Sequence, residues 1–486
     1  MGPHNPVATR TVGAVTPDDG KAIALELNRR AGDNPLYNQA RLELGPGRNA
    51  SWRISPEPYA ISLGVFHQLQ TLGNHLLAYM QAANKLYSES VKGRQPAWVA
   101  AYLDQGKPEA LIEYQRMNRF KKLTPMVIRP DIIVDEDGQL IACELDAVPG
   151  GIGLTGSMAY DYADFGFEPI GGRDGLVTGF AEMIRDVAGK INPTLAIVVS
   201  EESNDYWLEQ QWIGRELNAR GLETYVARPN DLHYTDDGLV VRQESGERRV
   251  DVIYRFFELF DLKNIPKAEL VQYANKKEQV IVTPPYKAFL EEKMTFALFH
   301  HPVLRAYWQQ ELGREAFHVL ENLIPRTWIL DPTPLPPQAV IPGLTVNGAP
   351  VTDWLQLVNT NKKERAFVVK PSGFSSLAWG SHGVAFGHDL SSEDWEVALK
   401  NALASFPQTP YLLQAFHKPA KTTVSYYNFH KEEVVPMDGR ARLCPYYYVA
   451  GGEAKLHGIL ATICPLDKLA IHGMVDSVMV PVTVAS

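Results

Sequence analysis

Apolar residues recur every three or four positions in several segments of the chain, and this spacing is typical of one face of an α-helix. The clearest segment begins near Pro58, with apolar residues at Ile61, Val65, Leu69, Leu72, Leu76 and Met80. Further helices are expected over 108–119, 174–189, 207–220, 286–323 and 393–406. Residues 1–55 are polar and rich in Gly, Pro and Asn, so we expect an extended or loop-rich lead-in there.

Short apolar runs bounded by turn residues predict strands. They lie at 126–134, 139–145, 194–200, 223–227, 250–257, 366–370 and 411–416, and the tail from 422 to 484 is mostly strand-like. The strand at 194–200, the helix over 207–220 and the strand at 223–227 follow the order of a small parallel α/β unit. The pattern therefore predicts an α/β (α+β) fold, with the Pro-rich residues 331–352 as a linker or long surface loop.

Composition narrows the possible partners and locations. The formal net charge is −9, whereas a protein that wraps nucleic acid has a basic face, so no nucleic-acid partner is expected. Cys143, Cys444 and Cys464 are too few and too scattered for a disulfide framework or a zinc site, and buried reduced thiols are expected. No apolar run reaches the ~18 residues of a membrane span. The N-terminus lacks the apolar segment of a secretory signal, so we expect a cytoplasmic protein without membrane contact.

Four charged residues lie in the two apolar runs that flank the Asp-Gly turn at 135–138. Arg129 and Asp131 are two positions apart in one predicted strand, and so are Glu144 and Asp146 in the next. Because residues i and i+2 of a strand share a face, each pair points one way, and all four could converge on one patch of sheet. Grouped carboxylate oxygens suit Mg²⁺. The alternative is a solvated, salt-bridged hairpin face.

Two lysines, Lys293 and Lys370, are candidates for binding phosphate. Lys370 ends a predicted strand and is followed by Ser372, Gly373 and a Gly- and Ser-rich loop, whose backbone N–H groups could cradle phosphates. The alternative is a flexible hairpin loop beside an exposed lysine. Lys293 is a single lysine on an apolar helix face, and by itself it is equally consistent with a surface lysine whose stem lies along apolar neighbours.

The run Gly151–Gly156 fits G-x-G-x-x-G, the dinucleotide fingerprint. That fingerprint requires a strand that runs straight into the first glycine and a helix that opens at the third. Here residues 146–149 intervene, and the helical pattern after Gly156 is weak. We therefore favour a glycine turn at Gly151 that lets a substrate approach the backbone, and a dinucleotide-dependent oxidoreductase remains a lesser alternative.

Taken in order, these motifs resemble the circularly permuted ATP-grasp ligases, in particular the synthetase domain of glutathionylspermidine synthase. The resemblance spans about residues 125–480. It rests on VIRPDIIVDEDGQLIACELDAVPGG, VDVIYRFFELFDL, FLEEKMTFALFHHP, AFVVKPSGFSS and YLLQAF, in that order. It implies a permuted ATP-grasp fold with an inserted, pre-ATP-grasp-like α/β unit. The implied boundaries are 1–120 for the lead-in and helical region, 121–190 for the hairpin and substrate loop, 191–280 for the insert and 281–486 for the ATP-binding subdomains.

The resemblance also implies roles for individual residues. Arg129 would stabilise negative charge that develops during catalysis, and the phosphate-binding residues would be Lys293, Lys370, Ser372 and Gly373, with Gln414 at the adenine hinge. The metal-binding and catalytic carboxylates, which would hold two Mg²⁺ ions, would be Asp131, Glu144 and Asp146. This chain departs from the relative in two ways. The relative has Asn where this chain has Asp146, so this chain carries an additional negative charge there. The amidase domain of the bifunctional synthase is absent.

The predicted activity is therefore an ATP-dependent carboxylate–amine ligase that forms an amide or peptide bond through an acyl phosphate. Its substrates would be a small-molecule or peptide carboxylate and an amine. Arg255, in an apolar strand, is a candidate for holding the substrate carboxylate, and an ion pair with Glu258 or Asp261 is the alternative. A nucleotide-binding scaffold without catalysis is a second possible function.

Overall fold

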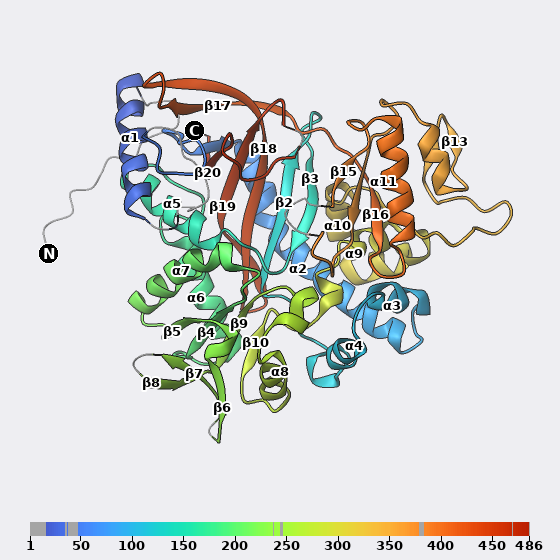
Figure 1. Ribbon diagram of the computed structural model, residues 1–486, viewed down its shortest axis with the longest axis horizontal. Coiled ribbons are helices and arrows are strands. Elements are labelled where there is room, and N and C mark those ends of the chain that lie inside the picture. Colours follow the sequence, from blue (N-terminus) through green and yellow to red (C-terminus); the bar gives the residue numbers. More distant parts are fainter. Residues whose placement is uncertain are drawn as a thin grey trace, which may run out of the picture.

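The protein is described by a computed structural model that covers residues 16–34, 36, 47–236, 238–243, 246–378, 383–468 and 470–485. Its architecture is mixed α/β with several separate sheets, as the alternation of helical and strand-like segments predicts (Figure 1). Three of these sheets matter for function and are called the main sheet, the parallel sheet and the small antiparallel sheet.

The main sheet joins strands from both ends of the chain. In spatial order it contains β1 (Tyr59–Ile61), β20 (Val478–Val484), β19 (Glu453–Pro465), β18 (Glu433–Ala450), β2 (Val127–Val134) and β3 (Leu140–Asp146), and β17 (Lys421–Asn428) pairs with the first half of β18. The predicted strand-rich tail is thus confirmed, and it brings the C-terminal strands beside the β2–β3 hairpin.

A bulge at Cys143 fixes the register of the β2–β3 hairpin. Next to the turn, Val134 pairs with Leu140, but beyond Ile132 the register shifts by one residue, and Asp131 pairs with Glu144. Residues opposite each other in an antiparallel pair share a face. Without the extra residue, Glu144 would face away from Asp131, because a slip of one residue exchanges the two faces. The bulge therefore places Glu144 on the face of Asp131.

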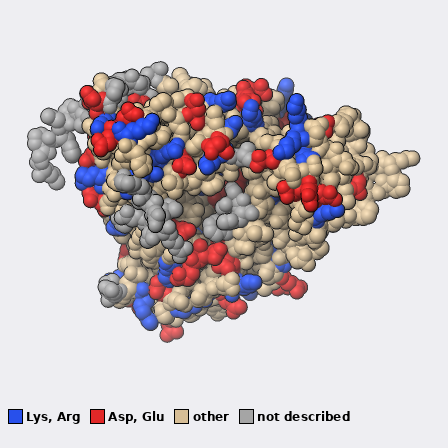
Figure 2. Space-filling view, turned by 45° about the horizontal axis from the view of Figure 1, so that its top comes forward, with Lys and Arg blue, Asp and Glu red and all other residues tan. Residues whose placement is uncertain are grey.

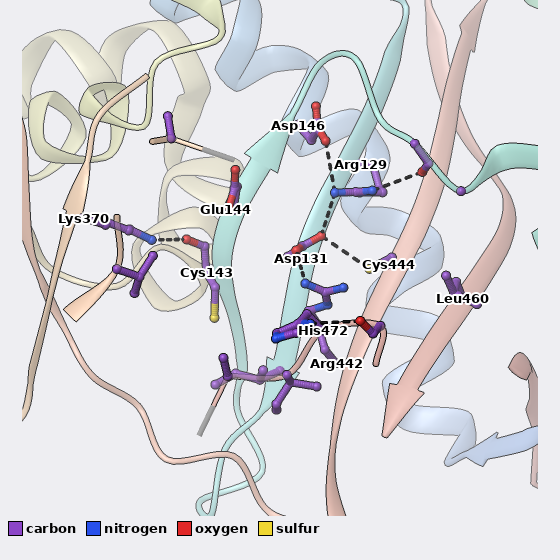
Figure 3. A pocket seen from close by; sticks show the side chains of 18 of the residues that line it. Arg129, Asp131, Cys143, Glu144, Asp146, Lys370, Arg442, Cys444, Leu460 and His472 are labelled. Atoms are coloured by element: carbon purple, nitrogen blue, oxygen red, sulfur yellow. Dashed lines mark hydrogen bonds and ion pairs between the residues drawn. The ribbon is translucent and has the colours of Figure 1, made fainter. Parts of the chain in front are cut away.

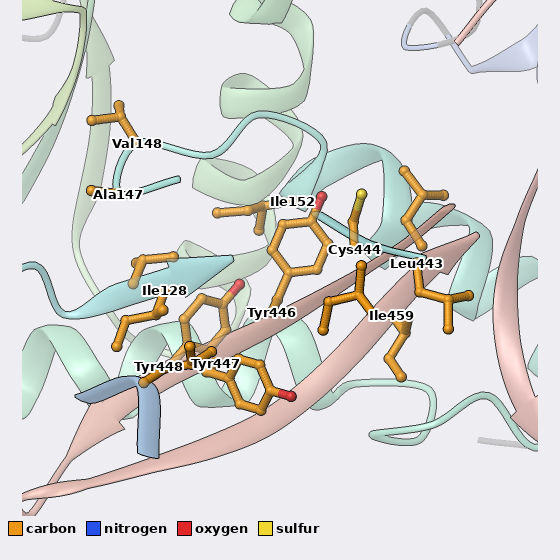
Figure 4. Close-up of a cluster of buried hydrophobic side chains, with 14 of the residues drawn as sticks. Ile128, Ala147, Val148, Ile152, Leu443, Cys444, Tyr446, Tyr447, Tyr448 and Ile459 are labelled. Atoms are coloured by element: carbon orange, nitrogen blue, oxygen red, sulfur yellow. The ribbon is translucent and has the colours of Figure 1, made fainter. Parts of the chain in front are cut away.

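Helices cover both faces of the main sheet. On one face lies α2 (Leu63–Val91), which begins at Ser62, whose hydroxyl accepts the Val65 N–H at 3.3 Å. On the other lie α5 (Ile152–Asp164) and α6 (Gly175–Ala188). Two buried tyrosines of β18, shown in Figure 4, contact the helices on the two faces. Tyr447 donates to the Leu69 carbonyl in α2 at 2.6 Å, and Tyr448 packs on Phe180 in α6.

The predicted parallel α/β unit is present below the main sheet in Figure 1. Its strands pair in parallel, in the order β10 (Ile281–Thr283), β9 (Val252–Phe256), β4 (Leu195–Val199) and β5 (Thr224–Ala227). It also contains α7 (Trp207–Ala219), α8 (Ala268–Lys276) and the strands β6 (Leu232–Thr235), β7 (Gly238–Gln243) and β8 (Gly246–Arg249). The 3₁₀ turn at 204–206 and α7 lie beside the N-terminus of α5, so this unit contributes to the site described below.

The small antiparallel sheet lies on the opposite side of the hairpin. Its strands are, in order, β11 (Thr327–Ile329), β16 (Tyr411–Ala415), β14 (Phe367–Pro371) and β15 (Ala385–Phe386), with α11 (Ser392–Ala404) packed on it. Before it come α9 (Met294–His300) and α10 (Arg305–Leu323). The Pro-rich segment is a long connection that contains a short hairpin, β12 (Thr345–Val346) and β13 (Ala349–Pro350).

The expectation for the lead-in was wrong in one part, because α1 (Pro17–Asp33) is a helix. Thr16 caps it by accepting the Asp19 N–H at 3.2 Å, and Ile23, Ala24, Leu27 and Ala31 form its buried face. The rest of the N-terminal region holds α3 (Ala97–Asp104) and α4 (Glu109–Gln115). None of the helices in the described part of the chain combines the length and the apolar character needed to cross a membrane.

Candidate functional site

A cavity of about 760 Å³ lies between the β2–β3 hairpin, the small antiparallel sheet and the start of α7. In the space-filling view a hollow opens near the middle of the molecule, and Asp and Glu side chains gather along its lower edge (Figure 2). Of the residues predicted for the site, those that line this cavity are Arg129, Asp131, Glu144, Asp146, Gly151, Lys293, Lys370 and Gln414. The structure thus brings together side chains that are up to 285 positions apart in sequence.

The four hairpin residues share one wall of the cavity, as Figure 3 shows. The guanidinium of Arg129 lies between two carboxylates, 3.2 Å from Asp131 and 3.0 Å from Asp146. Its second terminal nitrogen donates to the Gly150 carbonyl at 3.2 Å. Burial raises the pKa of Asp146, in spite of the neighbouring Arg129. Arg129 is therefore held in a fixed orientation, with Asp131 and Asp146 as its counter-ions.

Arg442, on β18, completes this wall and was missed in the sequence. Its Nη1 lies 2.9 Å from Oδ2 of Asp131, while Oδ1 of Asp131 faces Arg129 and the Cys444 thiol. Although burial raises the pKa of Asp131, Arg442 and Arg129 outweigh it and lower that pKa. The period-two run Arg440, Arg442, Cys444 could have indicated it, since these residues share a strand face.

The two predicted phosphate-binding lysines approach the hairpin from the other side. Nζ of Lys293, at the residue before α9, lies 2.7 Å from Oε1 of Glu144 and donates to the Ala378 carbonyl at 2.9 Å. Nζ of Lys370, at the end of β14, donates to the Cys143 carbonyl at 2.7 Å. Burial lowers the pKa of Lys370, whereas for Lys293 the carboxylate of Glu144 outweighs burial and raises the pKa.

The carboxylates differ in how well they suit a metal ion. Within the described residues, no group of three or more His, Cys, Asp or Glu side chains is placed to hold one. Both oxygens of Asp131 already face cationic or thiol donors of the protein, so Asp131 does not fit as a ligand. Glu144 is the most exposed of the three, at 36%, followed by Asp146 at 27%. Asp146 also meets two donors, Arg129 at Oδ2 and the Val148 N–H at Oδ1, but unlike Asp131 it is partly exposed and keeps lone pairs for a metal ion. Two carboxylates suffice for Mg²⁺ when phosphate oxygens complete its shell, so Glu144 and Asp146 fit better than Asp131.

Ser372 and Gly373 do not line the main cavity. The hydroxyl of Ser372 is fully buried; it donates to Glu292 and accepts the Met294 N–H at 3.0 Å. Gly373 lines an adjoining cavity of about 70 Å³. The side chain of Ser372 therefore anchors the loop rather than facing a ligand, which corrects its predicted role in phosphate binding. Residues 379–382 of the predicted phosphate loop lie outside the described residues.

Gln414 lies in β16, in the middle of the small antiparallel sheet. Its side-chain amide donates to the Thr327 hydroxyl at 3.1 Å, and the residue is buried. The chain that follows, 415–417, also lines the cavity. The residues after β16, rather than the Gln414 amide, thus border the cavity at this edge, and the N–H groups of Ala415 and Phe416 are already donated to the carbonyls of residues 326 and 366.

Arg255 does not line either cavity, which corrects its prediction as a substrate-binding residue. Its side chain is fully buried, and all three of its guanidinium nitrogens donate to the protein, to the carbonyls of residues 257, 284 and 285 and to Glu291. The ion-pair partner is Glu291, not Glu258 or Asp261. Arg255 therefore ties β9 to the segment before Lys293.

Gly151 caps the N-terminus of α5 in the left-handed conformation, at φ +85°, and a Cβ there would lie 2.6 Å from the Tyr446 hydroxyl. The helix begins at Ile152, so the weak helical pattern misled the sequence analysis. The carboxylate of Glu209 accepts the Leu154 N–H at 3.1 Å, and those of Gly151 and Gly153, and burial raises its pKa to about 7. Glu209 thus occupies the position that a dinucleotide pyrophosphate would need, which argues against the oxidoreductase.

No protein-family model matches the chain, and no curated protein matches its sequence. A provisionally assigned gamma-glutamylcysteine synthetase from Methylobacillus flagellatus shares 10% identity over 82% of this chain and 86% of its own, but its TM-score of 0.39 is too low to support an argument. The fold is similar to that of a glutathione synthetase-like effector (GSS30) from Globodera pallida in apo form. The two share 14% identity with a TM-score of 0.57, over 98% of this chain and 100% of that chain. At this identity the likeness shows the fold alone: a mixed α/β architecture similar to a glutathione synthetase-like protein.

Proposed function

We propose that the chain is an ATP-dependent carboxylate–amine ligase with a circularly permuted ATP-grasp fold. One observation carries the proposal: a single cavity holds Lys293 and Lys370 opposite the hairpin carboxylates Glu144 and Asp146, next to the end of β16. Two lysines and a carboxylate pair are what a polyphosphate and its metal ion need. The similarity of the whole fold to a glutathione synthetase-like protein supports the same class of reaction.

The nucleotide would lie between β16 and the hairpin, with its phosphates towards Lys293 and Lys370. Both lysines now donate to protein groups, a carboxylate and two carbonyls, which phosphate oxygens can replace. Glu144 and Asp146 would hold Mg²⁺, which when bound neutralises phosphate charge. Asp131, whose oxygens are occupied, would position Arg129 and Arg442 instead.

The reaction would take place at the arginine wall. A carboxylate oxygen of the acid attacks the γ-phosphorus, and ADP leaves. The amine nitrogen then attacks the carbonyl carbon of the acyl phosphate and loses a proton, and phosphate leaves with the electrons of the C–O bond. Arg129 would stabilise the negative charge that develops on the acyl oxygens, because two carboxylates and the Gly150 carbonyl fix its orientation beforehand.

One observation keeps a non-catalytic nucleotide-binding scaffold as a second candidate. Arg129, Arg442 and Lys293 each face a carboxylate of the hairpin, so in the absence of a ligand this group of charges is balanced within the protein. A structural salt-bridge network would show the same balance.

Calorimetry with ATP and NAD, each with and without Mg²⁺, followed by an ADP-release screen over paired acids and amines, tests the proposal. The ligase predicts ATP binding that strengthens with Mg²⁺ and ADP release that requires both an acid and an amine or another nucleophile. ATP binding without turnover for any pair would favour the scaffold. Binding of NAD but not ATP would overturn both.

A further inference from the structure

Among the cations of the cavity, Arg442 has the most donors without a partner in the described part of the chain. The terminal nitrogens of Arg129 face Asp131, Asp146 and the Gly150 carbonyl, and Lys293 and Lys370 each donate to protein oxygens. The buried Nε atoms of Arg129 and Arg442 both lack a partner among the described residues. Arg442 differs at its terminal nitrogens, whose one hydrogen bond to the described residues runs from Nη1 to Asp131. Its side chain is 24% exposed, at the cavity wall.

The cavity beyond Arg442 is lined mainly by apolar side chains. Across the main sheet, Arg442 on β18 pairs with residue 462 on β19, which pairs with Met479 on β20, so Arg442 and Met479 share a face. Leu460 lies on the same face, paired with Cys444, and Figure 3 draws it beyond Cys444 from Arg442. The lining also contains Trp52, Met474 and Val475, together with the polar side chains of Ser51 and His472, and Figure 3 labels His472 next to Arg442. The nucleotide end, with Lys293 and Lys370, lies on the other side of the hairpin carboxylates.

From this arrangement, and resting on the proposed ligase function, we propose that Arg442 binds the carboxylate of the acid substrate and that this acid has an apolar body. An arginine with free donors matches a carboxylate, and it lies beside Arg129, where the acyl phosphate would form. The chamber beyond offers mainly apolar surface, and its polar side chains, Ser51 and His472, are too few to pair all the amide and ammonium groups of a peptide. Buried polar groups without partners reduce affinity, so a polar acid is disfavoured there.

Hydroxylamine makes the test independent of the natural amine, because its nitrogen attacks an acyl phosphate to give a hydroxamate and phosphate. The acids are the series from propionate to hexanoate, compared with glycine, glutamate and glycylglycine. Each methylene group that enters the chamber is expected to lower KM about three- to fourfold. A KM that does not fall along the series, or a better kcat/KM for glutamate or glycylglycine than for hexanoate, would overturn the apolar chamber.

Two variants test the binding of the carboxylate and of the apolar body of the acid separately. Arg442→Gln is expected to raise the KM for every acid at least tenfold, with the Kd for ATP unchanged and the same gain per methylene. Met479→Gln is expected to reduce the gain per methylene, so that the KM for hexanoate rises more than the KM for propionate. Arg440→Gln is the matched control, since Arg440 lies two residues earlier on the same face of β18 but does not line the cavity. An unchanged KM in Arg442→Gln would overturn the role of Arg442.

Failure of the proposed function gives a different result. If the wild-type protein releases no ADP with any acid, the proposed ligase activity is wrong. The shift in melting temperature that an acid causes in the absence of ATP then tests the acid site independently of catalysis. Hexanoate should stabilise the wild type and the Arg440→Gln variant, and should stabilise the Arg442→Gln variant less. Equal stabilisation of all three, or none in the wild type, would overturn the acid site.

Discussion

The ion pair between Lys107 and Glu292 offers a sharp test of the packing beneath the site. The two side chains are 1% and 3% exposed, so the pair is almost completely removed from water. The second carboxylate oxygen of Glu292 accepts the Ser372 hydroxyl, which in turn accepts the Met294 N–H. This network fixes the start of the predicted phosphate loop against the residue that follows Lys293.

Lys107→Met removes the cation but keeps a long apolar side chain, so the main effect is a buried carboxylate without a counter-ion. Breaking a buried pair in this way costs about 3–5 kcal/mol of the free energy of unfolding. The matched control is Lys85→Met, because Lys85 pairs with Glu311 at the surface, with 53% of the lysine side chain exposed. Exposed pairs contribute about 0.2–1 kcal/mol. The two substitutions should therefore differ by a factor of at least about three in free energy.

Guanidinium denaturation followed by circular dichroism measures both changes. The double variant Lys107→Met/Glu292→Met should recover part of the loss, because no charge is left buried. A cost below about 1 kcal/mol for Lys107→Met, similar to that of an exposed pair, would show that water reaches Glu292 and that the loop is not anchored as the structure has it.

Three further predictions concern the cavity itself. Glu144→Gln should lower kcat/KM more than about tenfold, equivalent to about 1.4 kcal/mol, and weaken the dependence of ADP release on Mg²⁺; a smaller loss would contradict its metal role. Lys370→Met should raise the Kd for ATP by calorimetry and leave the acid KM unchanged, with the exposed Lys400→Met as control. Burial raises the pKa of Glu209 from 4.5 to about 7. Between pH 4.5 and 7 the folded state therefore binds more protons than the unfolded chain, so the free energy of unfolding falls as the pH rises through this range. Relative to Glu209→Gln, the wild type should lose stability between pH 4.5 and 7, and a difference independent of pH would refute this.

The hairpin shows what the sequence could and could not predict. Alternation and the Asp-Gly turn correctly predicted two antiparallel strands. The two-residue spacing also correctly placed Arg129 and Asp131 on one face of β2, and Glu144 and Asp146 on one face of β3. Whether the two pairs share a face depends on the bulge at Cys143, which no residue type in the run reveals. A regular hairpin from the same turn would have placed the pairs on opposite faces, so the sequence allowed their convergence but did not require it.

Arginines show the limits of local patterns more directly. Arg255 stands out in an apolar strand, yet its partner Glu291 is 36 positions away and absorbs its charge inside the fold. Arg442 looks ordinary in a polar–apolar alternation, yet the fold brings it to Asp131, 311 positions earlier. The helix α1 was missed for a related reason, because its buried face is narrow and many of its other positions are charged. Spacing indicates which residues share a face, but not what that face meets.

The pairing of charges in the cavity also bears on how a ligand could enter. A buried lysine or carboxylate that loses its partner without a replacement is costly, so a ligand that simply added charge to this wall would bind poorly. A polyphosphate brought in with a cation can instead exchange partners, since Lys293 can pass from Glu144 to phosphate while Glu144 gains the metal ion. Binding of ATP and Mg²⁺ should therefore be cooperative, and each should bind weakly without the other. This dependence would not arise if the paired charges served only to hold the hairpin in place.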